Sequence, residues 1–204
     1  MVEEGLRERG KTRRRAAITR AAFELFAERG YDATTVADIA ARAEVAPRTV
    51  AMYFRTKQDI ALSRFSEGAD QLTDALRDRR PGETALDILG RWVRAENAMP
   101  DDGNDELARR MFDANPELSA LRNARLAAAV HEATKAVADD LGVAPDALGP
   151  RIAAAAAAAV IMELANGSRA FGTEEDIVTA LDFIEAGMKS LGLAAGRETG
   201  ARSV

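Results

Sequence analysis

Hydrophobic residues along the chain recur at intervals of three and four, the spacing that places side chains on one face of an α-helix. No stretch alternates between polar and apolar positions in the way that a strand does. Glycine and proline separate the periodic segments. The pattern therefore predicts an all-α protein of about nine helices, at roughly residues 11–29, 36–43, 47–54, 57–79, 83–98, 105–114, 116–141, 151–171 and 174–191.

The segments at the two ends of the chain lack this spacing. Residues 1 to about 10 are expected to form a disordered arm, and the tail from Gly192 is expected to be loose. Helix starts are marked by two Thr-x-x-Asp patterns, Thr56–Asp59 and Thr173–Asp176, which are typical of a capping box.

The stretch at residues 34–57 predicts two short helices joined by a tight turn. Thr35 is a good N-cap, and Asp38 stands three residues later, where a capping-box acid is expected. Residues 44–46 form the turn. Pro47 then begins the second helix at a position where its missing N–H costs nothing. Two helices of this size joined in this way are typical of the helix-turn-helix, whose second helix lies in the DNA major groove.

Composition narrows the chemistry. The chain has no cysteine, which excludes disulfides, thiolate catalysis and zinc–thiolate sites, and its one histidine, His131, lies within a predicted helix. We therefore expect no catalytic residues, no metal and no cofactor, and the protein is not expected to be an enzyme. No apolar run of about 18 residues is identified as a membrane span, and the polar N-terminus predicts no signal peptide, so a cytoplasmic protein is expected.

The charge is divided unevenly along the chain. The net charge is −5, yet residues 1–57 carry 12 Lys and Arg against 8 Asp and Glu. The remaining residues carry 16 against 25. A basic N-terminal part on an acidic body suits a protein that contacts phosphate at one end only, although ordinary scatter of charge would also explain so modest an excess.

Residues 21–60, with the pattern AAFELFAERGYDATTVADIAARAEVAPRTVAMYFRTKQDI, resemble the N-terminal domain of TetR-family transcriptional regulators. Four positions depart from the family pattern. Glu44 stands where glycine is usual in the turn, which predicts a non-glycine residue with positive φ. Ala46 replaces the usual serine cap of the recognition helix. Arg48 replaces a common glycine, and Ala51 replaces a tyrosine that often contacts phosphate.

The resemblance implies a homodimeric repressor that a small-molecule inducer releases from a palindromic double-stranded DNA operator. It implies a helix-turn-helix DNA-binding domain at residues 1–57, a helical ligand-binding and dimerisation domain at 58–192 and a flexible tail at 193–204. The alternatives are a helical protein–protein interaction module and, less favoured, an enzyme. No membrane partner is expected.

Candidate DNA contacts follow from the helix-turn-helix. Arg48 is expected to be the chief base reader, because its forked donors match guanine O6 and N7. Lys57 is expected to contact phosphate at the start of the next helix. The full predicted set is Thr35, Ala46, Pro47, Arg48, Thr49, Met52, Tyr53 and Lys57, with Arg13, Arg14 and Arg15 as further phosphate contacts.

Candidate residues of the second domain come from its bulky and small apolar side chains. Soft or aromatic residues and three polar ones are predicted to line a ligand cavity: Trp92, Glu96, Met99, Met111, Phe112, Met162, Asn166 and Arg169. Alanines and a stripe on the last helix are predicted to form a four-helix dimer interface: Ala155, Ala159, Ile177, Leu181, Ile184 and Met188. A ligand pressed against the helix at 57–79 is predicted to change the spacing of the two recognition helices.

Overall fold

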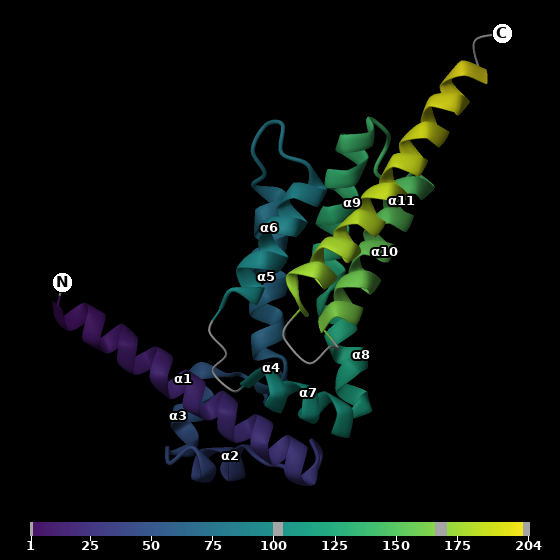
Figure 1. The fold of residues 1–204 in the computed structure, drawn as a ribbon. Helices are drawn as coiled ribbons and strands as arrows, with labels where there is room; N and C mark the ends of the chain where they lie inside the picture. The colour runs from purple at the N-terminus through teal and green to yellow at the C-terminus, as the bar shows by residue number, and fades with distance from the viewer. Residues whose placement is uncertain (1, 100–103, 166–170, 202–204) are drawn as a thin grey trace. The chain divides into compact units, whose positions relative to one another are not determined.

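The computed structural model describes residues 2–99, 104–165 and 171–201. These residues are helical with no strand, which confirms the all-α prediction (Figure 1). The described helices are α1 (Val2–Arg29), α2 (Val36–Arg42), α3 (Pro47–Tyr53), α4 (Lys57–Ala61), α5 (Ser63–Arg77), α6 (Ala85–Asn97), α7 (Asn104–Ala114), α8 (Pro116–Arg125), α9 (Ala127–Leu141), α10 (Leu148–Ala165) and α11 (Glu174–Ala201).

Two of the predicted helices are each divided by a single residue. Leu62, with φ −99° and ψ 4°, separates α4 from α5. Leu126, with φ −71° and ψ −17°, separates α8 from α9 and stays close to helical geometry. The described residues therefore contain eleven helices instead of about nine, with no change of fold class.

Both ends of the chain are more helical than the sequence pattern predicts. α1 begins at Val2, so the expected disordered arm is wrong for the described residues. α11 continues to Ala201, so the tail expected from Gly192 is helical up to that residue. Polar segments without proline can extend a neighbouring helix, because glycine lowers helix stability by only about 1 kcal/mol and does not block the backbone hydrogen bonds.

The chain folds into two compact units. The head unit contains residues 1–66 and 101–123, and the body unit contains residues 67–100 and 124–204. This division differs from the predicted one at residue 57, because α7 and most of α8 pack with the first four helices. A segment of the expected ligand-binding domain is thus part of the unit that contains the helix-turn-helix.

The core of the head unit is built around α1, which packs against α2, α4 and α7. Its inward face carries Ile18, Phe23 and Phe26, each at most 1% exposed. The same cluster receives two fully buried side chains from the discontinuous segment, Met111 of α7 and Leu118 of α8. The helix-turn-helix therefore depends for its packing on residues that lie 58 and 65 positions beyond the end of α3.

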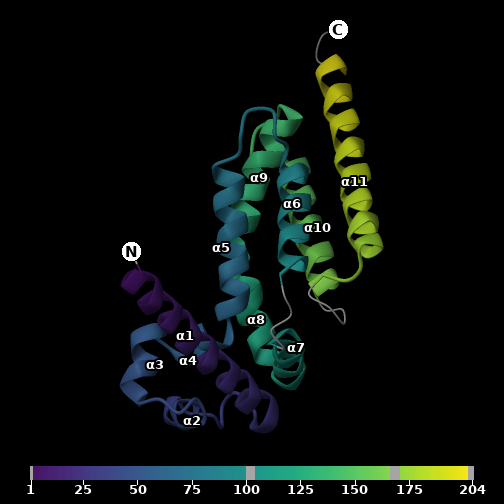
Figure 2. The same ribbon diagram turned by 60° about the vertical axis from the view of Figure 1, so that its left-hand side comes forward.

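The body unit is a bundle in which α10 packs against α9 and α11, and α6 packs against α9 and α11. Figure 2 shows α5, α6, α9 and α10 running alongside one another. Their buried side chains include Leu72 and Leu76 of α5 and Ile88 of α6. A second cluster joins Val93 of α6 to Ile177 of α11.

One described helix, α10, is long and apolar enough to cross a membrane by length and composition alone. The expectation of no such run is therefore wrong. The run escapes a search for large apolar residues because eight of its 18 residues are alanine. A single helix of this kind is a weak sign of a membrane span, since the core helix of a soluble protein meets the same test.

Candidate nucleic-acid interface

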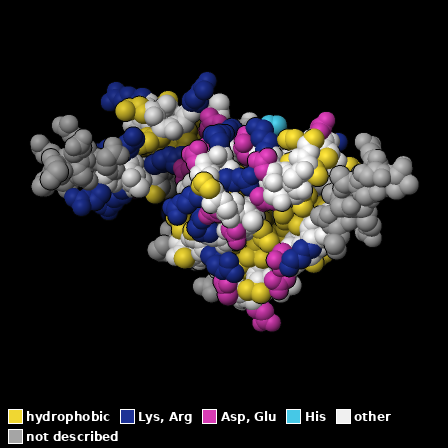
Figure 3. All heavy atoms as spheres, turned by 90° about the horizontal axis from the view of Figure 1, so that it is seen from above, with side chains coloured by type: hydrophobic (Ala, Val, Ile, Leu, Met, Phe, Trp, Pro, Cys, Tyr) yellow, Lys and Arg dark blue, Asp and Glu magenta, His cyan; other side chains and the backbone are white. Residues whose placement is uncertain are grey.

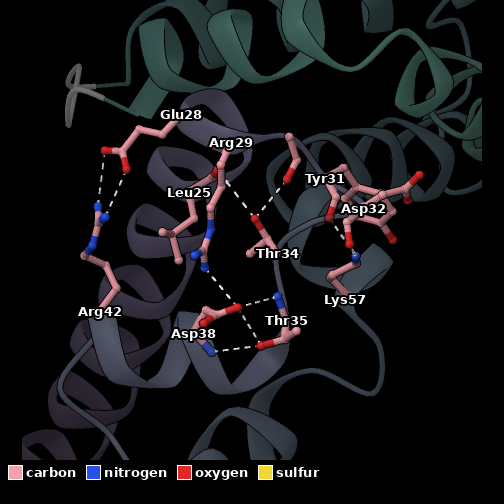
Figure 4. Close-up of polar contacts among 11 residues, drawn as sticks. Leu25, Glu28, Arg29, Tyr31, Asp32, Thr34, Thr35, Asp38, Arg42 and Lys57 are labelled. Carbon is pink, nitrogen blue, oxygen red and sulfur yellow. Dashed lines mark hydrogen bonds and ion pairs between the residues drawn. The ribbon is translucent and has the colours of Figure 1, made fainter.

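The first helix of the motif begins as its sequence predicts. The Thr35 side chain accepts a hydrogen bond from the Asp38 backbone N–H, and the Asp38 carboxylate accepts from the Thr35 backbone N–H over 2.9 Å (Figure 4). This capping box satisfies two amide groups that helix geometry would otherwise leave without partners. The same arrangement at Thr56 and Asp59 begins α4, so both predicted boxes at the head unit's helix starts are confirmed.

The turn between the two helices has the backbone predicted for it. Glu44 has φ 53°, the one non-glycine residue with positive φ among those described. The Val45 N–H donates to the Ala40 carbonyl over 2.9 Å, and the Glu44 N–H donates to Ala41. These two bonds form a Schellman motif, which normally favours glycine at the left-handed position. Glu44 therefore carries a local backbone strain at the point that sets the angle between α2 and α3.

α3 presents one face to the core and the other to solvent. Val50 is 1% exposed, whereas Met52 is 81% exposed and the side chains of Pro47 and Arg48 are also exposed. Ala46 occupies the N-cap and makes no side-chain cap bond, as its residue type predicts. The helix is therefore held by packing, and its open face offers a guanidinium, a thioether and a ring.

The remaining predicted DNA contacts lie along the same edge of the motif. Thr49 and Tyr53 of α3 are partly exposed, and Thr35 at the start of α2 is exposed. Tyr53 also packs against the head core, which leaves only part of its side chain open. The predicted contacts other than Lys57 and the α1 arginines therefore lie in α3 and at the N-caps of α2 and α3.

Ion pairs fasten α2 to α1. Nη2 of Arg29 lies 2.9 Å from Oδ2 of Asp38, and Nη2 of Arg42 lies 3.0 Å from Oε2 of Glu28 (Figure 4). The Thr35 hydroxyl and backbone amide, helped by Arg29, lower the pKa of Asp38 below its usual value. These pairs are exposed, so each contributes little alone, but together they orient the motif on α1.

Two side chains form hydrogen bonds with the backbone of Tyr31, which lies between α1 and α2. Its carbonyl oxygen accepts a hydrogen bond from Nζ of Lys57 over 2.6 Å, and that ammonium lies 4.1 Å from the Tyr31 ring centroid. Lys57, predicted as a phosphate contact, thus has its ammonium bound inside the head unit. On the other side, the Tyr31 N–H donates to Oδ1 of Asn115 over 2.5 Å.

Asn115, between α7 and α8, is a residue that the sequence analysis missed. It is 2% exposed, and its Nδ2 donates to the Phe26 carbonyl over 3.1 Å and to the Met111 carbonyl over 2.7 Å. Its partners in α1 and the following turn lie 89 and 84 positions away, respectively, so no local pattern marks it. Asn115 ties the discontinuous segment to the entrance of the helix-turn-helix.

The basic run on α1 is not uniform. Arg13 and Arg14 are exposed, whereas the Arg15 guanidinium lies 4.9 Å over the Phe54 ring and is partly buried. Lys and Arg side chains are visible around the first described turns of α1 in Figure 3. Arg13 and Arg14 are therefore the members of the run that are open to a phosphate.

The predicted ligand residues are not brought together in one unit. Met111 is fully buried in the head core and Phe112 packs on its edge, so the prediction that both line the body cavity is wrong. Helical spacing marks such residues as apolar but does not say which core they join. Asn166 and Arg169 lie outside the described residues. Trp92, Glu96, Met99 and Met162 belong to the body unit.

Trp92 is the member of this set with the most distinctive surroundings. Its ring meets the Phe171 ring edge to face, with centroids 5.4 Å apart. Its indole Nε1 is buried and has no hydrogen-bond partner among the described residues. A buried N–H without a partner costs about 1–3 kcal/mol, so this atom is suited to a ligand that brings an acceptor.

The predicted dimer stripe on α11 faces inward instead of outward. Ile177 is fully buried and Ile184 nearly so, while Leu181 and Met188 pack against the same chain's clusters. In the single chain the apolar face of this stripe is used within the body unit, and its part in a dimer stays a prediction. Ala155 and Ala159 of α10 are exposed, as a surface contact would require, and their role in a dimer stays a prediction.

Comparison with known proteins finds a family match within the head unit. Residues 18–63 match the family described as "Bacterial regulatory proteins, tetR family". The HTH-type transcriptional regulator TcmR of Streptomyces glaucescens is 38% identical over 102 residues, which cover 50% of this chain and 45% of that protein. The HTH-type transcriptional repressor Rv3405c of Mycobacterium tuberculosis is 42% identical over 79 residues, covering 37% of this chain and 42% of its relative.

The likeness of fold extends further than the likeness of sequence. The crystal structure of NalD from Pseudomonas aeruginosa matches with a TM-score of 0.59 and 25% identity, covering 87% of this chain and 96% of that one. The matched sequence spans less than half the length of the two curated relatives. The match to the tetR family of bacterial regulatory proteins thus covers the helix-turn-helix at residues 18–63, and the fold shared with NalD extends over 87% of the chain.

Proposed function

We propose that the protein is a homodimeric, cytoplasmic repressor that binds a palindromic operator through α3 and is released by a small-molecule inducer. The observation that carries this proposal is the exposed face of α3, where Arg48 and Met52 point away from a core that buries Val50. A helix held in this way can enter the major groove, where a guanidinium reads guanine and a thioether contacts a thymine methyl.

Repression is supported by the printed names of two similar proteins. Rv3405c is named a transcriptional repressor, and NalD is named the secondary repressor of the MexAB-OprM multidrug efflux pump. A repressor of this type needs two reading heads about one DNA turn apart, roughly 34–36 Å, which a two-fold dimer provides.

The exposed apolar face of α10 supports a dimer. Leu148 is 66% exposed and Ile152 is 48% exposed, and Ala155, Ala156 and Ala159 continue the same helical face. On α11, which packs against α10, Phe183 is 65% exposed. We propose that this face, defined by these six residues, pairs with its copy in a four-helix arrangement.

The dimer proposal is tested by the mass of the purified protein in light scattering. Phe183→Glu should yield monomers at concentrations where the wild type is a dimer, because a charge would be buried without a partner. Glu185→Lys, on nearly the opposite side of α11, is the matched control and should stay dimeric. A dimeric Phe183→Glu variant would contradict the proposed interface.

The inducer is proposed to bind in the body unit beside Trp92 and Phe171. An effector with a hydrogen-bond acceptor would supply the partner that Trp92 Nε1 lacks, with aromatic and aliphatic surface around it. The division between the two units falls within α5, so displacement of that helix would reach α4 and the helix-turn-helix through the chain itself. Coupling of this kind is typically worth about 1–3 kcal/mol and must be reciprocal between ligand and operator.

Selection from a pool of random-sequence duplexes tests the function directly. The wild-type protein should enrich a motif with two inverted half-sites, and its affinity should fall steeply with salt as phosphate contacts require. Binding without sequence preference, or no DNA binding at all, would refute the proposal. If the head unit were instead a helical protein–protein interaction module, no DNA binding would be observed.

A further inference from the structure

Arg122 of α8 has no acidic partner among the residues that the structure describes. Among the residues that the structure describes, its guanidinium has one recorded contact, the Phe112 ring of α7, whose centroid lies 4.8 Å from Cζ. Its Nε is buried and has no hydrogen-bond partner. The side chain as a whole is partly exposed, so this charge is neither fully solvated nor neutralised.

Two other arginines of the described residues differ from Arg122, because each has carboxylate partners. Arg109, on the neighbouring α7, donates to Glu106 over 2.9 and 2.5 Å and to Asp113 over 2.9 Å. Arg79 of the body unit binds Asp139 and Asp140. Arg122 is more buried than Arg109 and yet has no acid beside it.

This arrangement costs the protein free energy when no ligand is bound. Burial lowers the pKa of Arg122, and no neighbouring acid opposes that shift. The guanidinium remains charged at neutral pH despite this, because the pKa of arginine lies far above 7. A partly desolvated charge of this kind gains strongly from an added counter-ion.

The Phe112 ring gives the cation a defined orientation. A guanidinium stacked on an aromatic face loses the freedom of its long side chain before a ligand arrives. Its two Nη groups carry further N–H donors, and a pair of such donors matches the two oxygens of a carboxylate or phosphate. Leu107, Ala108 and Leu121 of the same two helices are partly buried against the head core, as is Phe112 itself.

We propose that Arg122 and Phe112 form a binding site for a small oxyanion, a carboxylate or a phosphate group, within the head unit. The site lies on α7 and α8, the segment that supplies Met111, Asn115 and Leu118 to the head core. An anion held there stabilises the segment on which the helix-turn-helix rests. This site is separate from the effector site proposed beside Trp92 and does not depend on it.

The test follows the Nε–Hε resonance of Arg122 in full-length protein labelled with ¹⁵N-arginine. Arg122→Lys identifies the resonance by removing it. Sodium phosphate and sodium benzoate are the two probes, and sodium chloride at equal ionic strength is the control. We expect a saturable shift with at least one probe, and the probe that produces it tells whether the site takes phosphate or carboxylate. Chloride should give none.

Two variants distinguish specific binding of the anion at Arg122 from a general effect of ionic strength. Binding of the probe is measured by the rise that it causes in the melting temperature. Arg122→Gln should weaken this binding by about tenfold or more, because two charge-assisted hydrogen bonds are lost. Arg109→Gln, an equally charged change on the adjacent helix, should leave it intact. In the absence of any probe, Arg122→Met should melt no lower than the wild type, since it removes an uncompensated charge.

Three results would overturn the proposal. They are no shift of the Arg122 resonance with either probe, a non-saturating shift shared with exposed arginines, and equal protection of the wild type and Arg122→Gln. None of these readouts involves DNA. Failure of the anion site is therefore distinguishable from failure of the repressor function.

Discussion

Replacing Asn115 should weaken the head unit more than any exposed substitution. Asn115→Ala removes the acceptor of the Tyr31 N–H and the two donations to Phe26 and Met111. The Phe26 carbonyl keeps the Gly30 N–H at 3.1 Å, whereas the Tyr31 N–H loses its acceptor and the Met111 carbonyl loses the Asn115 amide. A buried unsatisfied donor costs about 1–3 kcal/mol, and each lost bond between neutral groups adds about 0.5–1.5 kcal/mol.

Part of this cost is recovered by relaxation, so we expect Asn115→Ala to lower the free energy of unfolding by about 2–4 kcal/mol. For a chain of this size the melting temperature should fall by roughly 5–10 °C. Asn115→Asp should lower the free energy of unfolding more than Asn115→Ala does. It places a carboxylate oxygen beside the carbonyls of Phe26 and Met111, where the asparagine NH₂ group donates.

The assay is denaturation by urea, followed by circular dichroism at one protein concentration for all variants. Asn97→Ala is the matched control. Asn97 is partly exposed at the end of α6, and its side chain makes no hydrogen bond with the described residues. It should change stability by less than about 0.5 kcal/mol. An Asn115→Ala variant equal to that control would refute the structural role given to this amide.

Three further substitutions test local features of the head. Glu44→Gly should raise the free energy of unfolding by about 0.5–1 kcal/mol in a urea titration, because glycine relieves the positive φ, and a loss would contradict the strain. Asp38→Ala should be less stable than the wild type at neutral pH. The Thr35 hydroxyl lowers the pKa of Asp38, so its stabilisation is present above the unfolded pKa and lost as the pH falls through the folded one. The difference in stability between the wild type and Asp38→Ala should therefore become smaller at acid pH, and a difference that does not change with pH would refute this role of Asp38. Lys57→Met should lower stability without DNA and leave the salt slope of DNA binding unchanged, whereas a slope smaller by about one unit would restore the predicted phosphate contact.

Features set by neighbouring residues were predictable from the sequence. The capping box at Thr35 and Asp38 and the missing cap at Ala46 each involve atoms within a few residues of one another. The positive φ at Glu44 followed from the resemblance, because the family places glycine there. Local backbone chemistry decides these features before any tertiary contact forms.

Features set by distant contacts were not predictable. Met111 has the spacing of any apolar helix residue, and only the fold shows that it joins the head core. Asn115 looks like a loop residue before Pro116, and its role appears only when α1 lies beside it. The stripe through Ile177 and Ile184 was rightly recognised as apolar, but its partner is the same chain.

The central claim, that α3 reads DNA bases through its exposed face, is tested most directly by comparing the motifs that wild-type and Arg48→Ala protein select from random duplexes. The account predicts an inverted-repeat motif for the wild type. Arg48→Ala should lose preference at one position in each half-site, by about 1–3 kcal/mol, with the other positions unchanged. The same motif with the same preference at every position, selected by both proteins, would contradict the claim.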